Sequence, residues 1–141
     1  MIILDTNVAS EGFRKRPNVA VRRWLDVQVP EDIYLCAPVM AEIRYGIARL
    51  NGGEQKERLR AIADMFEDDL YKGRILPFDT SAASVYGRIA AERRQKGKPV
   101  DPMDGMIASI AVARGAAVAT RDRYGFSDLD LTVIDPFQFQ R

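Results

Sequence analysis

Histidine is absent from the 141 residues of the sequence. Its absence excludes Ser-His-Asp and Cys-His catalysis and removes the side chain on which most zinc sites depend. Acid–base chemistry in this chain must therefore be carried by carboxylates or by water bound to a metal ion.

Cysteine is nearly absent, and long apolar segments are missing. The one cysteine, Cys36, lies in an apolar, strand-like segment, so we exclude an internal disulfide and expect a buried, inert thiol. The longest apolar run, Gly105 to Ala113, is far shorter than the ~20 residues that span a bilayer. Because Asp5 follows the first four residues at once, we expect no signal peptide, no membrane association and a cytoplasmic protein.

Charge of one sign is also scarce, since the net charge is only +1. There is no global basic field of the kind that coats nucleic acid. Four local basic clusters remain, and each taken alone is interpreted as a solvated surface: Arg14-Lys15-Arg16, Arg22-Arg23, Arg93-Arg94 with Lys96 and Lys98, and Arg121 with Arg123. The length and the 47% hydrophobic content predict one domain, residues 1–141, with a sizeable core.

Short β-branched runs alternate with amphipathic stretches along the chain. Strands are predicted at Ile2 to Leu4, Ile33 to Cys36, Ile75 to Phe78, Ala117 to Thr120 and Leu131 to Ile134. Helices are predicted at Pro38 to Leu50, around Leu59 to Leu70, at Thr80 to Lys96 and at Pro102 to Arg114. This alternation predicts an α/β fold in which helices cover both faces of a mainly parallel sheet.

The segment from Leu50 to Gly73 interrupts this alternation. Asn51-Gly52-Gly53 breaks the helical pattern, so the flanking helices form a hairpin. Two interpretations of the hairpin stay open: a protruding pair that binds a partner, or a second layer that completes the core.

Four acidic residues fall at one edge of the predicted sheet: Asp5, Glu42, Asp104 and Asp122, here called the acidic quartet. Asp5 directly follows the first strand, and Asp122 lies two residues past the fourth. Glu42 and Asp104 lie in the first turns of helices, on the flank of each apolar face. Because parallel strands end, and crossover helices begin, at the same edge, we expect the quartet to form one site.

Four clustered carboxylates would repel one another and raise their pKa values unless a cation lay between them. An all-oxygen ligand set suits Mg²⁺ or Mn²⁺. Such an ion can activate water and polarise a phosphoryl group, which indicates phosphodiester hydrolysis. With no histidine to deprotonate a ribose 2′-hydroxyl, attack by water that leaves a 5′-phosphate is the hypothesis.

Each acid also has an ordinary structural explanation when taken alone. Asp5 suits a turn or helix cap, Asp104 suits the positive end of a helix dipole, and Asp122 suits a solvated loop. Glu42 is simply a good helix former. These explanations do not account for the convergence of all four residues on one edge.

Five neighbouring residues complete the set of candidates. Asp101, which precedes Pro102, is interpreted as a helix cap. Thr6 and Thr120 could orient water or phosphate through their hydroxyls, or serve as ordinary cap and strand residues. Arg121 and Arg123 could hold phosphates near the rim.

Four segments resemble the PIN-domain ribonucleases: Leu4-Asp5-Thr6-Asn7, Ala41-Glu42-Ile43 with Gly46, Asp104-Gly105-Met106-Ile107-Ala108 and Thr120-Arg121-Asp122. The resemblance covers nearly the whole chain and is greatest to the VapC toxins of bacterial toxin–antitoxin pairs. The run from Gly73 to Asp79 is similar to the FitB-like subgroup.

The resemblance implies a PIN-like sheet and a Mg²⁺-dependent endoribonuclease that acts as a toxin. It implies that Asp5 and Asp104 are the principal metal ligands, that Glu42 and Asp122 complete the site directly or through water, and that Thr120 lines it. It further implies RNA as the substrate, a homodimer, and a small antitoxin with a DNA-binding domain whose tail fills the acidic groove. Operator DNA would be reached only through the antitoxin complex.

Two alternatives remain beside the toxin. The first is a haloacid-dehalogenase-like phosphatase with Asp5 as nucleophile, although such enzymes carry a second acid where Asn7 stands here. The second is a catalytically silent module that binds RNA, or operator DNA with its partner. The acidic quartet weighs against the silent module, because carboxylates without a metal repel a phosphate backbone.

Overall fold

The structure is a computed structural model that describes residues 1–140. These residues form one five-stranded sheet in the order β3-β2-β1-β4-β5, and every strand pair is parallel. The strands are β1 (Ile2–Leu4), β2 (Ile33–Cys36), β3 (Ile75–Leu76), β4 (Ala117–Ala119) and β5 (Val133–Ile134). The predicted α/β class and the parallel sheet are therefore confirmed.

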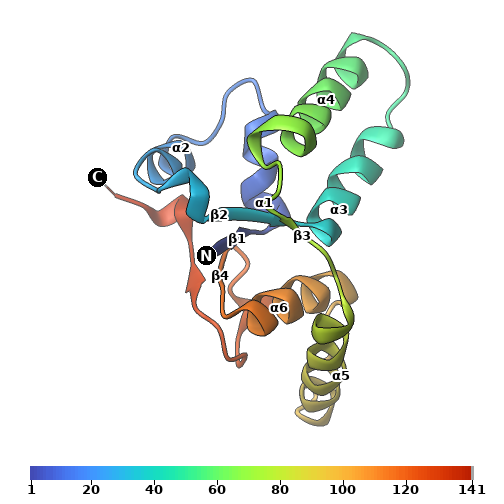
Figure 1. The fold of residues 1–141 in the computed structure, drawn as a ribbon, viewed down its shortest axis with the longest axis vertical. Helices are drawn as coiled ribbons and strands as arrows, with labels where there is room; N and C mark the ends of the chain where they lie inside the picture. Colours follow the sequence, from blue (N-terminus) through green and yellow to red (C-terminus); the bar gives the residue numbers. More distant parts are fainter. Residues whose placement is uncertain (141) are drawn as a thin grey trace.

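Helices cover both faces of the sheet. They are α1 (Thr6–Ala9), α2 (Val19–Asp26), α3 (Ala37–Ala48), α4 (Glu54–Met65), α5 (Thr80–Gln95) and α6 (Pro102–Arg114). Figure 1 shows α1 to α4 on one side of the sheet and α5 and α6 on the other. From β1 the chain moves to one edge of the sheet through β2 and β3, and it then crosses back to form β4 and β5 on the other side of β1. Connections between parallel strands are right-handed, so connections that run toward opposite edges place their helices on opposite faces of the sheet. The direction of winding thus changes between β1 and β4.

The core lies where the central strands meet the helices. Ile3, Leu35 and Val118 have no exposed surface, and Ile107 of α6 is equally buried against the sheet. Cys36 is buried beside them, and its burial raises the pKa of the thiol to about 12. The expected burial of the thiol is confirmed, and the raised pKa disfavours the reactive thiolate at neutral pH.

Helix boundaries follow local capping chemistry. The side chain of Asp101 accepts hydrogen bonds from the N–H groups of Met103 and Asp104, so α6 begins as predicted. Asp79 caps α5 by accepting the Ala82 N–H. The predicted strand from Ile75 to Phe78 was too long, because Pro77 has no N–H to give to a sheet.

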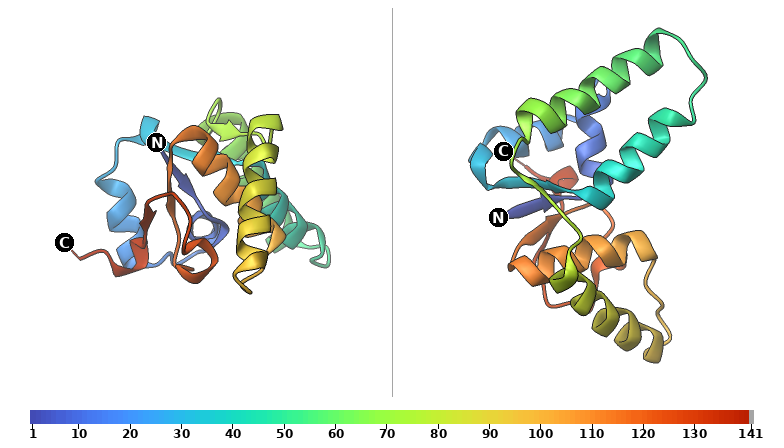
Figure 2. Two further views of the ribbon diagram at one scale, coloured as in Figure 1. Left: turned by 90° about the horizontal axis from the view of Figure 1, so that it is seen from below. Right: turned by 45° about the vertical axis from the view of Figure 1, so that its right-hand side comes forward.

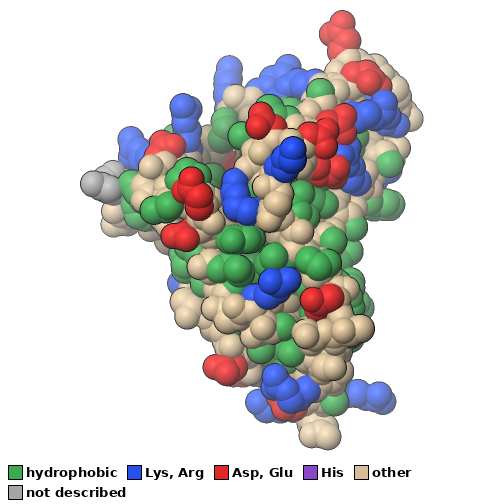
Figure 3. Space-filling view, in the orientation of Figure 1, with side chains coloured by type: hydrophobic (Ala, Val, Ile, Leu, Met, Phe, Trp, Pro, Cys, Tyr) green, Lys and Arg blue, Asp and Glu red, His purple; other side chains and the backbone are tan. Residues whose placement is uncertain are grey.

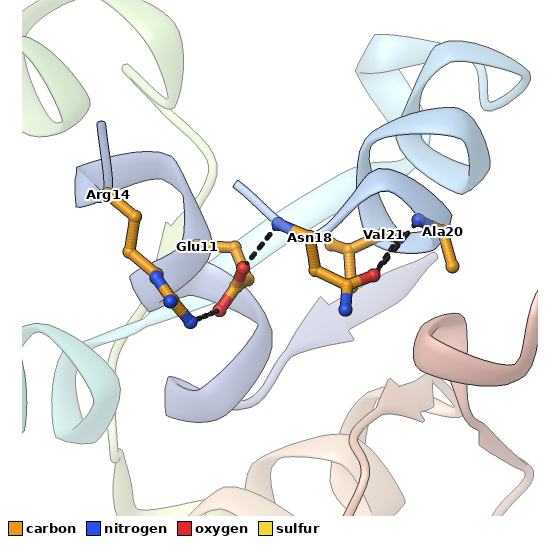
Figure 4. Close-up of polar contacts among 5 residues, drawn as sticks. All are labelled: Glu11, Arg14, Asn18, Ala20 and Val21. Atoms are coloured by element: carbon orange, nitrogen blue, oxygen red, sulfur yellow. Dashed lines mark hydrogen bonds and ion pairs between the residues drawn. The ribbon is translucent and has the colours of Figure 1, made fainter. Parts of the chain in front are cut away.

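Two helices between β1 and β2 were missed by the sequence analysis. Helix α1 has only four residues, too few for a helical period to be recognised. Helix α2 is capped by Asn18, whose side chain accepts the N–H groups of Ala20 and Val21 (Figure 4). Other boundaries differ by one or two residues at β4, β5, α3 and α5, and α4 begins and ends five residues earlier than the predicted helix.

The predicted helical hairpin corresponds to α3 and α4. Its outer end extends beyond the sheet, as the right-hand view of Figure 2 shows, while its base packs into the core. Ala63 and Phe66 are buried there, and the Phe66 ring lies 4.7 Å from Phe13 and 5.1 Å from Tyr71, centroid to centroid. The base therefore completes the core, and the outer end protrudes, while partner binding by that end stays a prediction.

Within residues 1–140, no helix has both the length and the apolar character required to cross a membrane.

Replacing Phe66 with alanine should remove the anchor of the hairpin base. We expect Phe66→Ala to lower the free energy of unfolding by about 3–5 kcal/mol, because the substitution opens a cavity between Phe13 and Tyr71. The exposed neighbour Met65 provides the control, since Met65→Ala should change the free energy of unfolding by less than about 0.5 kcal/mol. Urea denaturation measures both, and equal effects would contradict the assigned packing.

Candidate active site

The acidic quartet lies around the carboxyl ends of β1 and β4, where the winding direction changes. Asp5 follows β1 directly, and its N–H donates to the carbonyl oxygen of Ala119 at 2.9 Å. Its carboxylate caps α1 by accepting the Thr6 N–H at 2.7 Å. Only 4% of Asp5 is exposed, so its carboxylate is largely shielded from solvent. It lies at the position where open α/β sheets bind ligands.

Thr120 fixes the second oxygen of Asp5. The Thr120 hydroxyl donates to Asp5 Oδ2 at 2.7 Å and accepts the Asp122 N–H at 3.0 Å. Thr120 is fully buried and follows β4, so this one hydroxyl joins the ends of the two central strands. Of the two roles left open for Thr120, it therefore serves at least the structural one.

Asn7 belongs to the same network and was not among the predicted site residues. Its side-chain nitrogen, Nδ2, donates to Asp5 Oδ2 at 3.2 Å and to Thr120 Oγ1 at 3.0 Å, while its side-chain oxygen, Oδ1, accepts the Arg121 N–H. The signal for Asn7 was its position two residues after Asp5, within the Asp-Thr-Asn run. Sequence alone could not indicate that this amide reaches across to β4.

Glu42 is brought to the site by α3. The Thr6 hydroxyl donates to Glu42 Oε1 at 2.6 Å, which joins α3 to the start of α1. Thr6, Glu42 and Gly46 line one hollow of about 200 Å³. A methyl group added at Gly46 would meet no atom within 4 Å, so the predicted space beside this carboxylate is present.

Asp104 and Asp122 approach the same glycine from different elements. A Cβ placed on Gly125 would lie 2.8 Å from an oxygen of each carboxylate, so a side chain there would force both carboxylates to move. The Gly125 N–H also donates to Asp122 Oδ1 at 3.0 Å. Gly125 was missed by the sequence analysis, because a close backbone approach leaves no sequence pattern beyond the glycine itself.

Burial and mutual repulsion raise the pKa values of two members of the quartet. The Asp5 pKa is raised mainly by burial, against the hydrogen bonds from Thr120 and Thr6, with Glu42 and Asp122 adding to the rise. The Asp104 pKa is raised to about 6, first by burial and then by the charges of Asp5, Asp101, Asp122 and Glu42. The four carboxylates therefore act on one another, as their predicted convergence requires.

The donor set suits a hard divalent cation. Every member of the quartet offers carboxylate oxygen, and a cation among them would relieve the repulsion that raises the two pKa values. Within residues 1–140, however, no group of three or more acidic or thiol side chains is arranged to hold a metal ion directly. An ion bound here would thus use one or two carboxylates and complete its shell with water, which is usual for Mg²⁺.

The remaining predicted residues lie around the quartet. Asp101 caps α6, as predicted. Arg121 and Arg123 are both exposed at the end of β4, and the Arg121 guanidinium lies 4.2 Å above the centre of the Phe137 ring. Stacking on an aromatic ring leaves the guanidinium edge free to donate hydrogen bonds.

Removing the charge of Asp104 should make the metal-free protein less sensitive to pH. The pKa of Asp104 is about 6 in the folded chain, against an ordinary 3.8. Between these two pH values the folded chain binds more protons than the unfolded chain, so the stability of the wild type falls as the pH rises from about 4 to above 6. Asp104→Asn escapes that loss. In EDTA we expect the melting temperature of Asp104→Asn to match the wild type near pH 4 and to exceed it at pH 7.5.

Asp130 supplies the control for this experiment. It is exposed and lies beside Met1 at the opposite edge of the sheet, so Asp130→Asn should leave the melting temperature unchanged at both pH values. A gain for Asp104→Asn that does not grow with pH would contradict the prediction.

Comparison with known proteins places this geometry in a family. The model of the PIN domain matches residues 2–131. The chain is 42% identical to toxin FitB of Neisseria gonorrhoeae, over 97% of this chain and 99% of that protein, and 38% identical to VapC ribonuclease Y4jK of Sinorhizobium fredii, over 98% and 99%. The solved structure of FitAB bound to an IR36 DNA fragment has a TM-score of 0.91 at 40% identity, covering 100% of this chain and 99% of that one. The chain therefore belongs to the PIN-domain family, alongside the FitB and VapC toxins.

Proposed function

We propose that this protein is a Mg²⁺-dependent endoribonuclease, the toxic component of a toxin–antitoxin pair. The observation that carries the proposal is the acidic quartet at the ends of β1 and β4, in which burial and neighbouring carboxylates raise the pKa values of Asp5 and Asp104. Relatives named as toxin FitB and as a VapC ribonuclease support the same activity.

Asp5 and Asp104 are the proposed principal ligands of the ion. Asp5 is oriented by three donors, from Thr6, Asn7 and Thr120, so its carboxylate needs little reorganisation to bind a cation. When bound, the ion supplies Lewis acidity that lowers the pKa of water and stabilises charge on phosphoryl oxygens, and Mn²⁺ could substitute for Mg²⁺.

Glu42 and Asp122 are the proposed second pair, acting on the attacking water. Thr6 holds Glu42 Oε1 and leaves the other carboxylate oxygen free to accept a hydrogen bond. Gly125 and Thr120 hold Asp122 at both its side chain and its backbone. Two acceptors fixed in this way can orient a water for in-line attack on a phosphodiester.

The partners follow from the same family membership. Arg121 and Arg123 are proposed phosphate contacts for the RNA. FitAB bound to a DNA fragment supports an assembly of toxin with antitoxin, through which operator DNA would be reached. A homodimer and an antitoxin tail in the acidic groove belong to the proposal as well.

The alternatives have less support. In the phosphatase hypothesis the second acid is replaced by Asn7, whose amide is occupied by Asp5 and Thr120. The silent binding module leaves unexplained why four carboxylates, which repel a phosphate backbone when no metal ion lies among them, gather at the ends of β1 and β4.

Replacing Asp5 with asparagine should abolish cleavage without unfolding the chain. We expect Asp5→Asn to lower the rate by more than about 100-fold, beyond the usual loss for residues that only orient a metal ligand. A second measurement is independent of activity: millimolar Mg²⁺ should raise the melting temperature of the wild type but not of Asp5→Asn.

Asp101→Asn is the matched control, since asparagine caps a helix as well as aspartate does. This variant should cleave RNA at the wild-type rate and keep its stabilisation by Mg²⁺. Undiminished cleavage by folded Asp5→Asn would overturn the metal-site assignment.

The ends of the cleaved RNA provide a separate prediction. Attack by water should leave a 5′-phosphate and a 3′-hydroxyl, because the chain has no histidine to deprotonate a ribose 2′-hydroxyl. Such fragments are directly ligatable by an RNA ligase that requires a 5′-phosphate. Fragments that end in a 2′,3′-cyclic phosphate would refute this chemistry.

A further inference from the structure

The loop between α1 and α2 is held in shape by a buried carboxylate (Figure 4). Glu11 is 5% exposed, and its two oxygens reach both ends of the loop. One accepts the Asn18 N–H at 2.7 Å, and the other pairs with Arg14 Nη1 at 3.3 Å. Lys15 and Arg16 lie between these anchors and are exposed. The loop is therefore a fixed turn that presents two cationic side chains to solvent.

The same turn forms one wall of a basic hollow. The hollow has a volume of about 640 Å³ and is lined by Phe13, Arg14, Lys15, Arg16, Gln55, Arg58 and Leu59. Four of these residues are cationic and, among residues 1–140, none of the lining residues is acidic. Arg58 of α4 donates to the carbonyl oxygen of Phe13 at 3.1 Å and so ties α4 to the turn. Figure 3 shows Lys and Arg side chains gathered between α2 and α4, at the top of the view.

The basic hollow adjoins the acidic quartet. Phe13 and Leu59 line both the basic hollow and the smaller one that contains Thr6 and Glu42. The two hollows therefore share a wall, and the second contains Glu42, one member of the quartet.

We propose that the basic hollow, formed by Arg14, Lys15, Arg16 and Arg58, binds the phosphate backbone of single-stranded RNA and leads it to the acidic quartet. The proposal rests on the proposed ribonuclease function and names a substrate contact beyond Arg121 and Arg123.

Electrostatics favours RNA as the occupant. A phosphate chain that approaches four carboxylates is repelled, and cations along its approach offset that cost. Arg14 is paired with Glu11, but Lys15, Arg16 and Arg58 have no carboxylate partner among the described residues, so a polyanion is the complementary ligand of the hollow. An acidic protein segment has the same sign of charge, and the proposed antitoxin tail also reaches the acidic groove, but only a substrate must run from a backbone contact to the metal-binding carboxylates in order to be cleaved, so RNA is the proposed occupant.

Lys15→Gln with Arg16→Gln tests the hollow without removing an anchor. Arg14 pairs with Glu11 and Arg58 holds the Phe13 carbonyl, so both stay unchanged. Binding of a labelled single-stranded RNA 20-mer, followed by anisotropy in EDTA, should weaken by about tenfold, and the slope of log affinity against log salt should flatten by about 1.4 for two lost contacts. In Mg²⁺ the KM for RNA should rise while kcat stays near the wild-type value.

The control is Arg94→Gln with Lys96→Gln, an equal loss of charge at exposed positions at the end of α5. It should leave the RNA affinity and the salt slope unchanged.

Three outcomes separate the hypotheses. Wild-type cleavage with an unchanged KM and salt slope in the Lys15/Arg16 variant overturns the RNA path and leaves the ribonuclease standing. Weakened RNA binding by a protein whose wild type never cleaves RNA supports the path and overturns the ribonuclease. A variant that loses affinity for a poly-glutamate probe but binds RNA normally assigns the hollow to an acidic protein segment, which also overturns the proposal.

Discussion

The hydrogen bond from Thr120 to Asp5 joins the two strands on which the site depends. β1 and β4 are adjacent in the sheet, yet 113 residues separate Asn7 from Thr120, the two groups that hold Asp5 Oδ2. Because Thr120 is fully buried, no water can replace this bond, and losing it would leave the hydroxyl without an acceptor for its proton. The bond therefore fixes both the end of β4 and the direction of the Asp5 carboxylate. Asp122, two residues on, is positioned by the same oxygen.

The acidic quartet is a local conflict that the rest of the fold tolerates. Folding buries Asp5 and brings Asp104 close to the other three carboxylates of the quartet, which raises the pKa values of both residues. A protein selected only for stability would replace one of these carboxylates with a neutral side chain. Gly125 supports the same conclusion, because a side chain at this position would displace the carboxylates of Asp104 and Asp122. Such concentrated strain is expected where function, and not packing, determines the residues.

The sequence was sufficient for the parts of the fold that follow from chain direction. Parallel strands end at one edge, so the quartet could be gathered from strand and helix positions alone, and the pKa rise of Asp104 follows that gathering. Capping residues marked α6 at both ends, through Asp101 and Gly115. What could not be predicted depends on strand order. Nothing along the chain indicates that β4 lies beside β1, so the contact of Asn7 with Thr120 was invisible, and α1 was too short to display a helical period.

The missed segment is also the one that links the two halves of the proposed RNA path. Thr6, at the start of α1, holds Glu42 in the quartet, and Glu11, five residues on, holds the turn that carries Lys15 and Arg16. Gly12 directly follows Glu11 and lies against the Phe66 ring at the base of the hairpin, where a Cβ would come within 2.8 Å of the ring and force it to move. One short, well-packed segment therefore sets the separation between the carboxylates and the cations. The backbone of a single strand is flexible, so a strand bound at the turn can span this separation and place a phosphodiester at the carboxylates.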